Sequence, residues 1–161
     1  MKKNTRIVVF AIFVIYCLLI IYVTFLGVGR ANVWSDVSIW EYASRMANLH
    51  PFKTISMYVT RLNPSNPMFA VAVVNLSVNF ILLLPMGFLL PVLFDKLRNF
   101  FATIGICTAI LIVIEIMQLF TRRGSFDVDD FILNLTGAAL GFLIWFIRSK
   151  ISAKKKIKDD N

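Results

Sequence analysis

The sequence predicts an all-α integral membrane protein, a bundle of four transmembrane helices with one longer extracellular loop bearing short amphipathic helices. Of its 161 residues, 58% are hydrophobic, against about 45–50% in soluble domains. The mean hydropathy is +0.76, and the apolar residues form four long blocks. About 20 apolar residues cross a bilayer as a helix, and no block alternates like a barrel strand, so helices are the predicted spanning elements.

The four helices are predicted at about residues 7–26, 71–94, 100–120 and 131–147. A transmembrane domain over 1–147 would then be followed by a basic cytoplasmic tail at 148–161. The first block follows basic residues, as in a signal peptide, but it is longer than the usual apolar region and no small-residue cleavage site follows it. We therefore expect an uncleaved membrane anchor.

The block at 71–94 contains both polar residues and helix breakers. Asn75 and Asn79 are four residues apart, so they share a helical face. Pro85 lacks an N–H group and frees the carbonyl of Ile81, which predicts a kink at Pro85-Met86-Gly87. Two interpretations follow: neighbouring helices absorb the break, or a discontinuous helix forms a binding site, as in transporters.

The loop at 27–70 is rich in aromatic residues and contains two stretches with helical periodicity. Ser35 or Asp36 is the predicted N-cap of the first helix. Amphipathic pieces of this kind suit a membrane surface. Their apolar faces consist of Ile39, Trp40, Ala43 and Met46 in the first, and Ile55, Tyr58, Val59 and Leu62 in the second.

The distribution of Lys and Arg predicts the orientation, because cytoplasmic segments carry an excess of both. With four spans, the two tails and the turn at 95–99 lie on one side and hold 11 basic residues, while the two remaining loops hold six. The prediction is a multi-pass protein of the cell membrane with cytoplasmic N- and C-termini. Nucleic acid is not an expected partner, because the chain has no soluble domain to present a basic face.

This topology brings the unusual polar residues of the chain together at the outer leaflet. Glu115 and Gln118 end the third block, and Asn134 opens the fourth. Asn75 and Asn79 lie in the outer part of the second. The long loop adds His50 and Lys53. The connection between the last two helices adds Arg122, Arg123, Asp127, Asp129 and Asp130.

Three stretches resemble the VanZ-like membrane proteins. They are NLHPFKTI at 48–55, NLSVNFILLLPMGFLLP at 75–91 and EIMQLFTRRGSFDVDDFILNLTGAALG at 115–141. The resemblance implies a membrane location and a link to low-level resistance against teicoplanin-type glycopeptides in Gram-positive bacteria, but it implies no reaction. Two features depart from the family pattern: the Arg pair with Gly124 before the acidic run, and His50 before Pro51.

Candidate roles follow from the chemistry of these side chains. Ionisable groups inside a membrane are usually functional, so Glu115, Asp127 and Asp130 are the candidate catalytic residues. Basic side chains hold anionic headgroups. No cofactor is expected and no metal site is assigned, because the acidic run matches no metal-binding loop signature. The candidate ligand-binding residues are Arg122, Arg123, Asn75, Asn79, Gln118, Asn134 and Lys53.

Three functions remain open at this point. The first is a cell-envelope accessory that binds or modifies an anionic component, such as an anionic lipid or a lipid-linked cell-wall precursor. The second is a membrane-embedded enzyme acting on such a precursor, with Glu115 or Asp130 as general base. The third is a purely structural polar network. Gly137 and Gly141 allow close helix packing, within one chain or between two copies.

Overall fold

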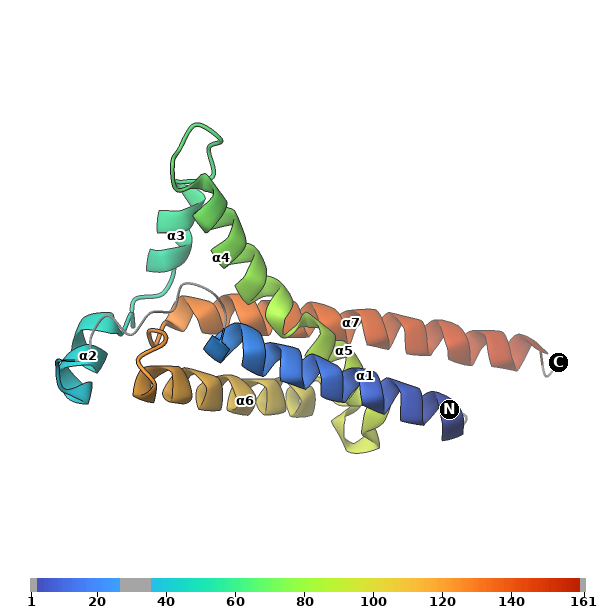
Figure 1. Ribbon diagram of the computed structural model, residues 1–161. Helices are drawn as coiled ribbons and strands as arrows, with labels where there is room; N and C mark the ends of the chain where they lie inside the picture. The colour runs from blue at the N-terminus through green and yellow to red at the C-terminus, as the bar shows by residue number, and fades with distance from the viewer. Residues whose placement is uncertain (1–2, 27–35, 160–161) are drawn as a thin grey trace.

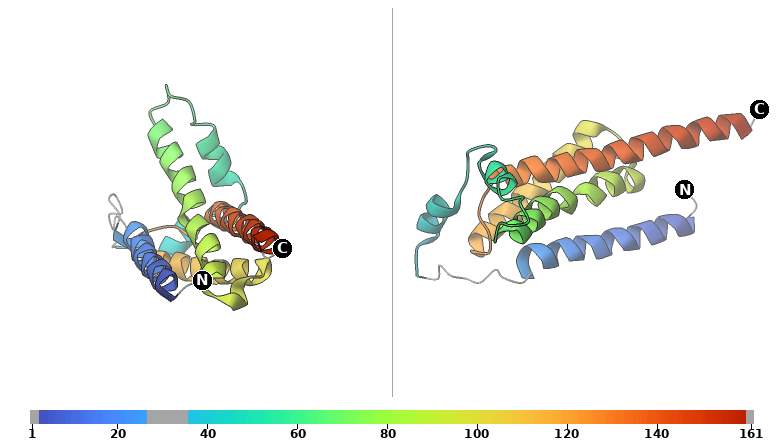
Figure 2. Two further views of the ribbon diagram at one scale, coloured as in Figure 1. Left: turned by 90° about the vertical axis from the view of Figure 1, so that its right-hand side faces the viewer. Right: turned by 90° about the horizontal axis from the view of Figure 1, so that it is seen from above.

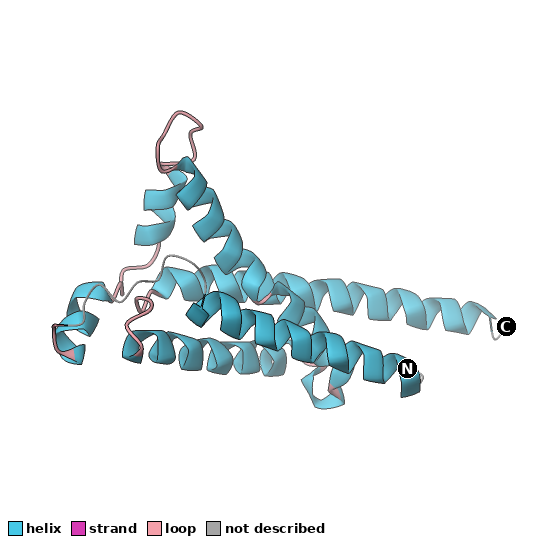
Figure 3. Ribbon diagram, in the orientation of Figure 1, coloured by secondary structure: helices cyan, strands magenta, loops and turns pink. Residues whose placement is uncertain are grey.

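Four long apolar helices make up the body of the protein in the computed structural model, which describes residues 3–26 and 36–159 (Figure 1). All regular elements in these ranges are helices (Figure 3). Four helices are long and apolar enough to cross a membrane: Lys3–Leu26, Phe69–Leu93, Phe100–Phe120 and Val128–Lys155. The predicted fold class is confirmed, and the chain is a membrane protein.

The two described ends of the chain lie at one end of the bundle, and two short helices lie at the other (Figures 1 and 2). The last helix continues well past the predicted end at 147. In chain order the elements are α1 (Lys3–Ile21) with the π-helical turn η1 (Tyr22–Leu26), α2 (Ile39–Met46), α3 (Lys53–Val59), α4 (Phe69–Leu82), α5 (Leu84–Leu93), the 3-10 turn η2 (Asp95–Leu97), α6 (Phe100–Phe120) and α7 (Val128–Asp159).

The second span is broken at Leu83, where α4 ends and α5 begins at an angle to it (Figure 1). The predicted kink is present, but the break falls just before Pro85, which sits in the first turn of α5. That position suits proline, since the first N–H groups of a helix have no intrahelical partner. The Tyr16 hydroxyl of α1 donates a hydrogen bond to the Leu82 carbonyl at the break. A neighbouring helix thus satisfies the backbone there.

Glycines hold α7 against the broken span at backbone contact. A Cβ placed on Gly87, Gly137 or Gly141 would lie within about 2 Å of a carbonyl oxygen of the facing helix. The seam that these glycines form in the structure is therefore within one chain, and a seam between two copies stays a prediction. The distances from the added Cβ are 1.9 Å to Ala138 O for Gly87, 1.9 Å to Phe80 O for Gly137 and 2.0 Å to Leu84 O for Gly141.

The two predicted amphipathic helices are present as α2 and α3. The N-cap of α2 is Ser38, whose hydroxyl accepts a hydrogen bond from the Glu41 N–H at 3.2 Å. The predicted cap was wrong for Asp36, which lies in a turn two residues before Ser38, and Ser35 lies outside the described residues. Trp40 is 82% exposed on α2, as an aromatic residue at a membrane surface would be.

The close packing at these glycines predicts that Gly→Ala substitutions lower stability there but not at an unpacked glycine. Gly87→Ala and Gly137→Ala should each cost about 1–3 kcal/mol of stability, because the added methyl forces two backbones apart. Gly105→Ala on α6 is the matched control, since its Cβ would meet nothing within 4 Å. Thermal unfolding of the purified protein in detergent measures the difference. Equal melting temperatures for Gly87→Ala and Gly105→Ala would contradict it.

Candidate functional site

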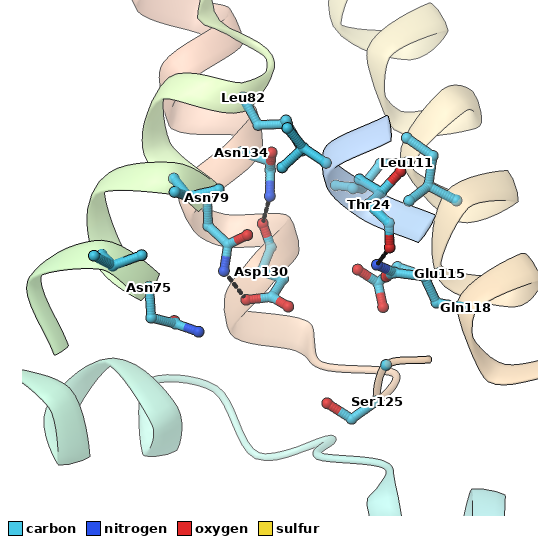
Figure 4. A pocket seen from close by; sticks show the side chains of 15 residues that line it. Thr24, Asn75, Asn79, Leu82, Leu111, Glu115, Gln118, Ser125, Asp130 and Asn134 are labelled. Atoms are coloured by element: carbon cyan, nitrogen blue, oxygen red, sulfur yellow. Dashed lines mark hydrogen bonds between the residues drawn. The ribbon is translucent and has the colours of Figure 1, made fainter. Parts of the chain in front are cut away.

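A polar cavity of about 350 Å³ lies among the four spans, toward the end of the bundle that carries α2 and α3 (Figure 4). Each span contributes polar side chains to it. Its remaining walls are apolar side chains of the same helices, together with Gly124 of the α6–α7 connection. The polar lining consists of Thr24 from η1, Asn75 and Asn79 from α4, Glu115 and Gln118 from α6, Ser125 from the α6–α7 connection, and Asp130 and Asn134 from α7.

The end of the first span forms one side of this cavity. The last carbonyls of a helix have no intrahelical partner and need donors from elsewhere. The Gln118 amide nitrogen donates to the Thr24 carbonyl at 3.1 Å, and the Arg123 guanidinium donates to the Phe25 carbonyl. Two residues predicted to bind a ligand thus cap the first span.

Asn79, Asp130 and Asn134 meet on the opposite side. The Asn79 amide nitrogen donates to the Asp130 carboxylate at 2.5 Å, which connects α4 with α7. The Asn134 amide nitrogen donates to the Asp130 backbone carbonyl, one helical turn earlier, at 2.8 Å. The close backbone approach of these two helices at the glycines brings Asn79 within reach of Asp130.

Glu115 faces the cavity from α6, on the side across from Asp130 (Figure 4). Its side chain is 3% exposed. Burying a carboxylate is costly unless it has partners or a proton, and both Glu115 and Asp130 do have interaction partners within the protein. The cavity therefore contains two carboxylates on facing helices, held in place by the protein itself.

Asp129 lies outside the cavity and binds the start of α3. Its side chain is 0% exposed, and its two oxygens accept hydrogen bonds from three backbone N–H groups. These belong to Phe52 at 2.5 Å, Thr54 at 2.6 Å and Ile55 at 3.0 Å. A carboxylate at this place satisfies the first N–H groups of a helix and complements its dipole. Asp129 is thus the N-terminal cap of α3, supplied from α7.

Asp127 completes this contact, which we call the acidic clasp (Asn48, Thr54, Asp127 and Asp129). The Asp127 carboxylate accepts from the Asn48 amide at 2.9 Å, the Thr54 hydroxyl at 2.6 Å and the Asp129 N–H at 2.9 Å. Backbone hydrogen bonds pair Asn48 with the segment around Asp127. The clasp joins two motifs that are far apart in the sequence. Asp127 does not line the cavity, and its predicted catalytic role remains untested.

The basic residues predicted to hold an anion lie elsewhere. None of the described residues that line the cavity is Lys, Arg or His. Lys53 is exposed at the first position of α3, and His50 is exposed just before it. Arg122 has a positive φ of 54° at the end of α6, and it shortly precedes Gly124, which does line the cavity. The basic groups therefore lie at or beyond the rim.

Five residues of these two arrangements were not among the predicted site residues. Thr24 and Ser125 line the cavity, and Asn48, Thr54 and Asp129 belong to the clasp. A signal existed for Thr24, a polar residue near the end of an apolar block, and for Asn48, which opens one of the family-like motifs. Within the described ranges, no group of three or more His, Cys, Asp or Glu is placed to hold a metal ion.

The fold and the cavity define a class: a four-helix membrane protein with a polar site lined by side chains from all four spans. The family model described as VanZ/LLP1 matches residues 13–149, and the chain belongs to this family. The resemblance seen in the sequence is confirmed. A search of curated proteins gave no match, and a search of solved structures gave none either.

The acidic clasp predicts how α3 responds to loss of Asp129. Asp129→Ala removes the acceptor for three backbone N–H groups and should cost about 2–3 kcal/mol, as charged hydrogen bonds do. Trypsin should then cut faster at Lys53 and Arg61, at the two ends of α3, in purified protein. Asp95→Ala, at an exposed residue of η2, is the control. Unchanged cleavage in Asp129→Ala would argue against the capping role.

Proposed function

We propose that this protein is a cell-envelope accessory of the cell membrane that binds the headgroup region of an envelope lipid or a lipid-linked cell-wall precursor. One observation carries the proposal: a cavity of about 350 Å³, lined by polar side chains from all four spans. Polar and ionisable side chains at membrane depth are costly and mark functional sites by default. An amphiphile in the same leaflet could enter such a site without leaving the membrane.

The basic-residue count supports an orientation in which the cavity opens toward the outer leaflet. The side that holds both tails carries 11 Lys and Arg residues, and the side that holds α2 and α3 carries six. Both termini are then cytoplasmic. Arg122, Arg123 and Lys53 would lie at the outer surface, where a phosphate of the bound amphiphile could contact them. The anionic part of the ligand thus belongs at the rim in this proposal.

The link to glycopeptide resistance rests on the family. In the proposed orientation the protein would bind lipid-linked precursors at the outer face of the membrane. A protein that binds such precursors or their neighbouring lipids would change what the antibiotic meets there. In this proposal binding alone would account for resistance, without a reaction.

A second candidate is a membrane-embedded enzyme that acts on a lipid-linked precursor. The observation that favours it is the presence of Glu115 and Asp130 on facing helices of one cavity (Figure 4). Two carboxylates in different surroundings can act as general acid and general base. The third candidate is a purely structural polar network. The hydrogen bond between Asn79 and Asp130, which joins α4 to α7, supports it.

Charge removal at the two cavity carboxylates separates function from structure. Glu115→Gln and Asp130→Asn keep the shape of each side chain, so the protein should reach its normal membrane level. Teicoplanin susceptibility of the cells should become that of cells without the gene. Glu41→Gln and Asp95→Asn, both at exposed ion pairs, are the matched controls and should behave as the unaltered protein.

Loss of the protein from the membrane in the cavity variants alone would instead support the structural network and sink both functional candidates. Lipid extracts from cells with and without the gene then distinguish a binder from an enzyme. An altered lipid profile that reverts in Glu115→Gln would favour the enzyme, and an unchanged profile favours binding.

The proposed orientation predicts a labelling pattern. In a background with Cys17→Ala and Cys107→Ala, a cysteine at Ser65 should react with a membrane-impermeant maleimide added to intact cells. A cysteine at Lys155 should react only after the cells are opened. Both positions are exposed in the structure, so access depends on the side of the membrane alone. The reverse pattern would place the cavity at the inner leaflet.

A further inference from the structure

The side chain of Asn134 holds a hydrogen-bond acceptor that the protein does not use. Asn134 is 1% exposed and lines the cavity, and its Oδ1 atom is buried without a hydrogen-bond partner. The orientation of the amide is fixed, because its nitrogen donates to the Asp130 carbonyl at 2.8 Å. Turning it over would set two oxygens against each other. Figure 4 shows the nitrogen toward Asp130 and the oxygen on the opposite side.

Other amides of the lining each show one part of this pattern. Asn79 and Gln118 both donate from the amide nitrogen to oxygens of the protein, at 2.5 and 3.1 Å. The Oδ1 atom of Asn75 is also buried without a hydrogen-bond partner. Three of the four lining amides therefore use their donors within the protein, while two amide oxygens are left over. Buried acceptors without donors are costly and rare, so these oxygens point to a ligand that donates.

We propose that the cavity takes an uncharged group rich in hydrogen-bond donors, such as the hydroxyls of a sugar, on the bound amphiphile. This inference rests on the proposed function and names the part of the ligand that enters the site. A phosphate diester has acceptors and no donors, so it cannot satisfy Asn134 and stays outside the cavity. Of a lipid-linked precursor, the sugar rather than the phosphate is then the part that the protein recognises.

Charge argues for a neutral donor over an ammonium group. The two carboxylates of the lining, Glu115 and Asp130, already interact with partners within the protein. The lining atoms left without a hydrogen bond are the neutral amide oxygens of Asn75 and Asn134, together with Oε2 of Glu115, a carboxylate that has another interaction partner in the protein. Hydroxyls satisfy such oxygens without bringing a charge into a site of low dielectric. The cavity volume of about 350 Å³ is at the lower end of ligand sites, which suits a single headgroup.

Lipid selectivity tests the proposal directly. The full-length protein is placed in phosphatidylcholine nanodiscs that contain one probe lipid of matched acyl chains: monoglucosyl-diacylglycerol, phosphatidic acid or phosphatidylethanolamine. Native mass spectrometry then measures the bound lipid. We expect the glucosyl lipid to be retained over both others. Asn134→Leu should weaken its retention about fivefold, the effect of one hydrogen bond, while Thr136→Leu on the exposed side of α7 should change nothing.

The stability of the lipid-free variants gives a second measurement. Asn134→Leu should change the melting temperature little, because the loss of its hydrogen bond to the Asp130 carbonyl is offset by removal of a buried acceptor without a donor. Asn79→Leu should lower it, since it strips the Asp130 carboxylate of a donor. A fall in Asn134→Leu as large as that in Asn79→Leu would overturn the proposal, because Asn134 would then serve the fold.

The remaining outcomes distinguish failure of this inference from failure of the proposed lipid-binding function. Preferred retention of phosphatidic acid or phosphatidylethanolamine that depends on Asn134 would overturn the neutral-donor inference and leave the binding function standing. Retention of the glucosyl lipid that is unchanged in Asn134→Leu would show that water satisfies the acceptor, which also overturns the inference. If neither Asn134→Leu nor Glu115→Gln changes retention of any probe, the proposed function fails as well.

Discussion

The polar cavity depends on the backbone contact between α7 and the broken second span. In a membrane, helices associate by packing and hydrogen bonds, because lipid chains are as apolar as the side chains that contact them. Gly87, Gly137 and Gly141 remove the side chains that would separate the two helices. At that separation Asn79 reaches Asp130. The glycine contacts that let α7 approach the second span therefore also position Asn79 and Asp130 in the cavity.

Irregular backbone surrounds the cavity on two sides, and in each case a neighbouring helix supplies the missing hydrogen bond. Tyr16 donates to the carbonyl exposed by the α4–α5 break, and Gln118 and Arg123 donate to the carbonyls at the end of η1. Backbone of this kind persists at membrane depth only where protein groups satisfy it. Gln118 and Arg123 of the family-like motif thus stabilise the backbone, and fewer polar residues of this motif remain available to contact a ligand.

The sequence predicted the four spans well, because a run of about 20 apolar residues has few alternatives. It also brought Asn79, Glu115, Asp130 and Asn134 to one end of the bundle, where the structure places them in one cavity. It did not predict that Asp129, the neighbour of Asp130, caps α3. Adjacent residues on a helix point about 100° apart, so one carboxylate caps α3 and the other lines the cavity. The hydrogen bond from Arg123 to the Phe25 carbonyl could not be predicted either, because every residue has a backbone carbonyl and the sequence does not mark this one.

The length of α7 has a mechanical consequence. Its 32 residues extend about 48 Å at 1.5 Å per residue, which exceeds a hydrocarbon core of about 30 Å. Its first turn is bound both to the loop helix α3 and to the rim of the cavity, and its far end carries a cluster of lysines. A continuous helix tilts as a rigid lever. A change in tilt about its glycine contacts with the second span would move the first turn and the lysine-bearing end together, which couples the two membrane surfaces mechanically.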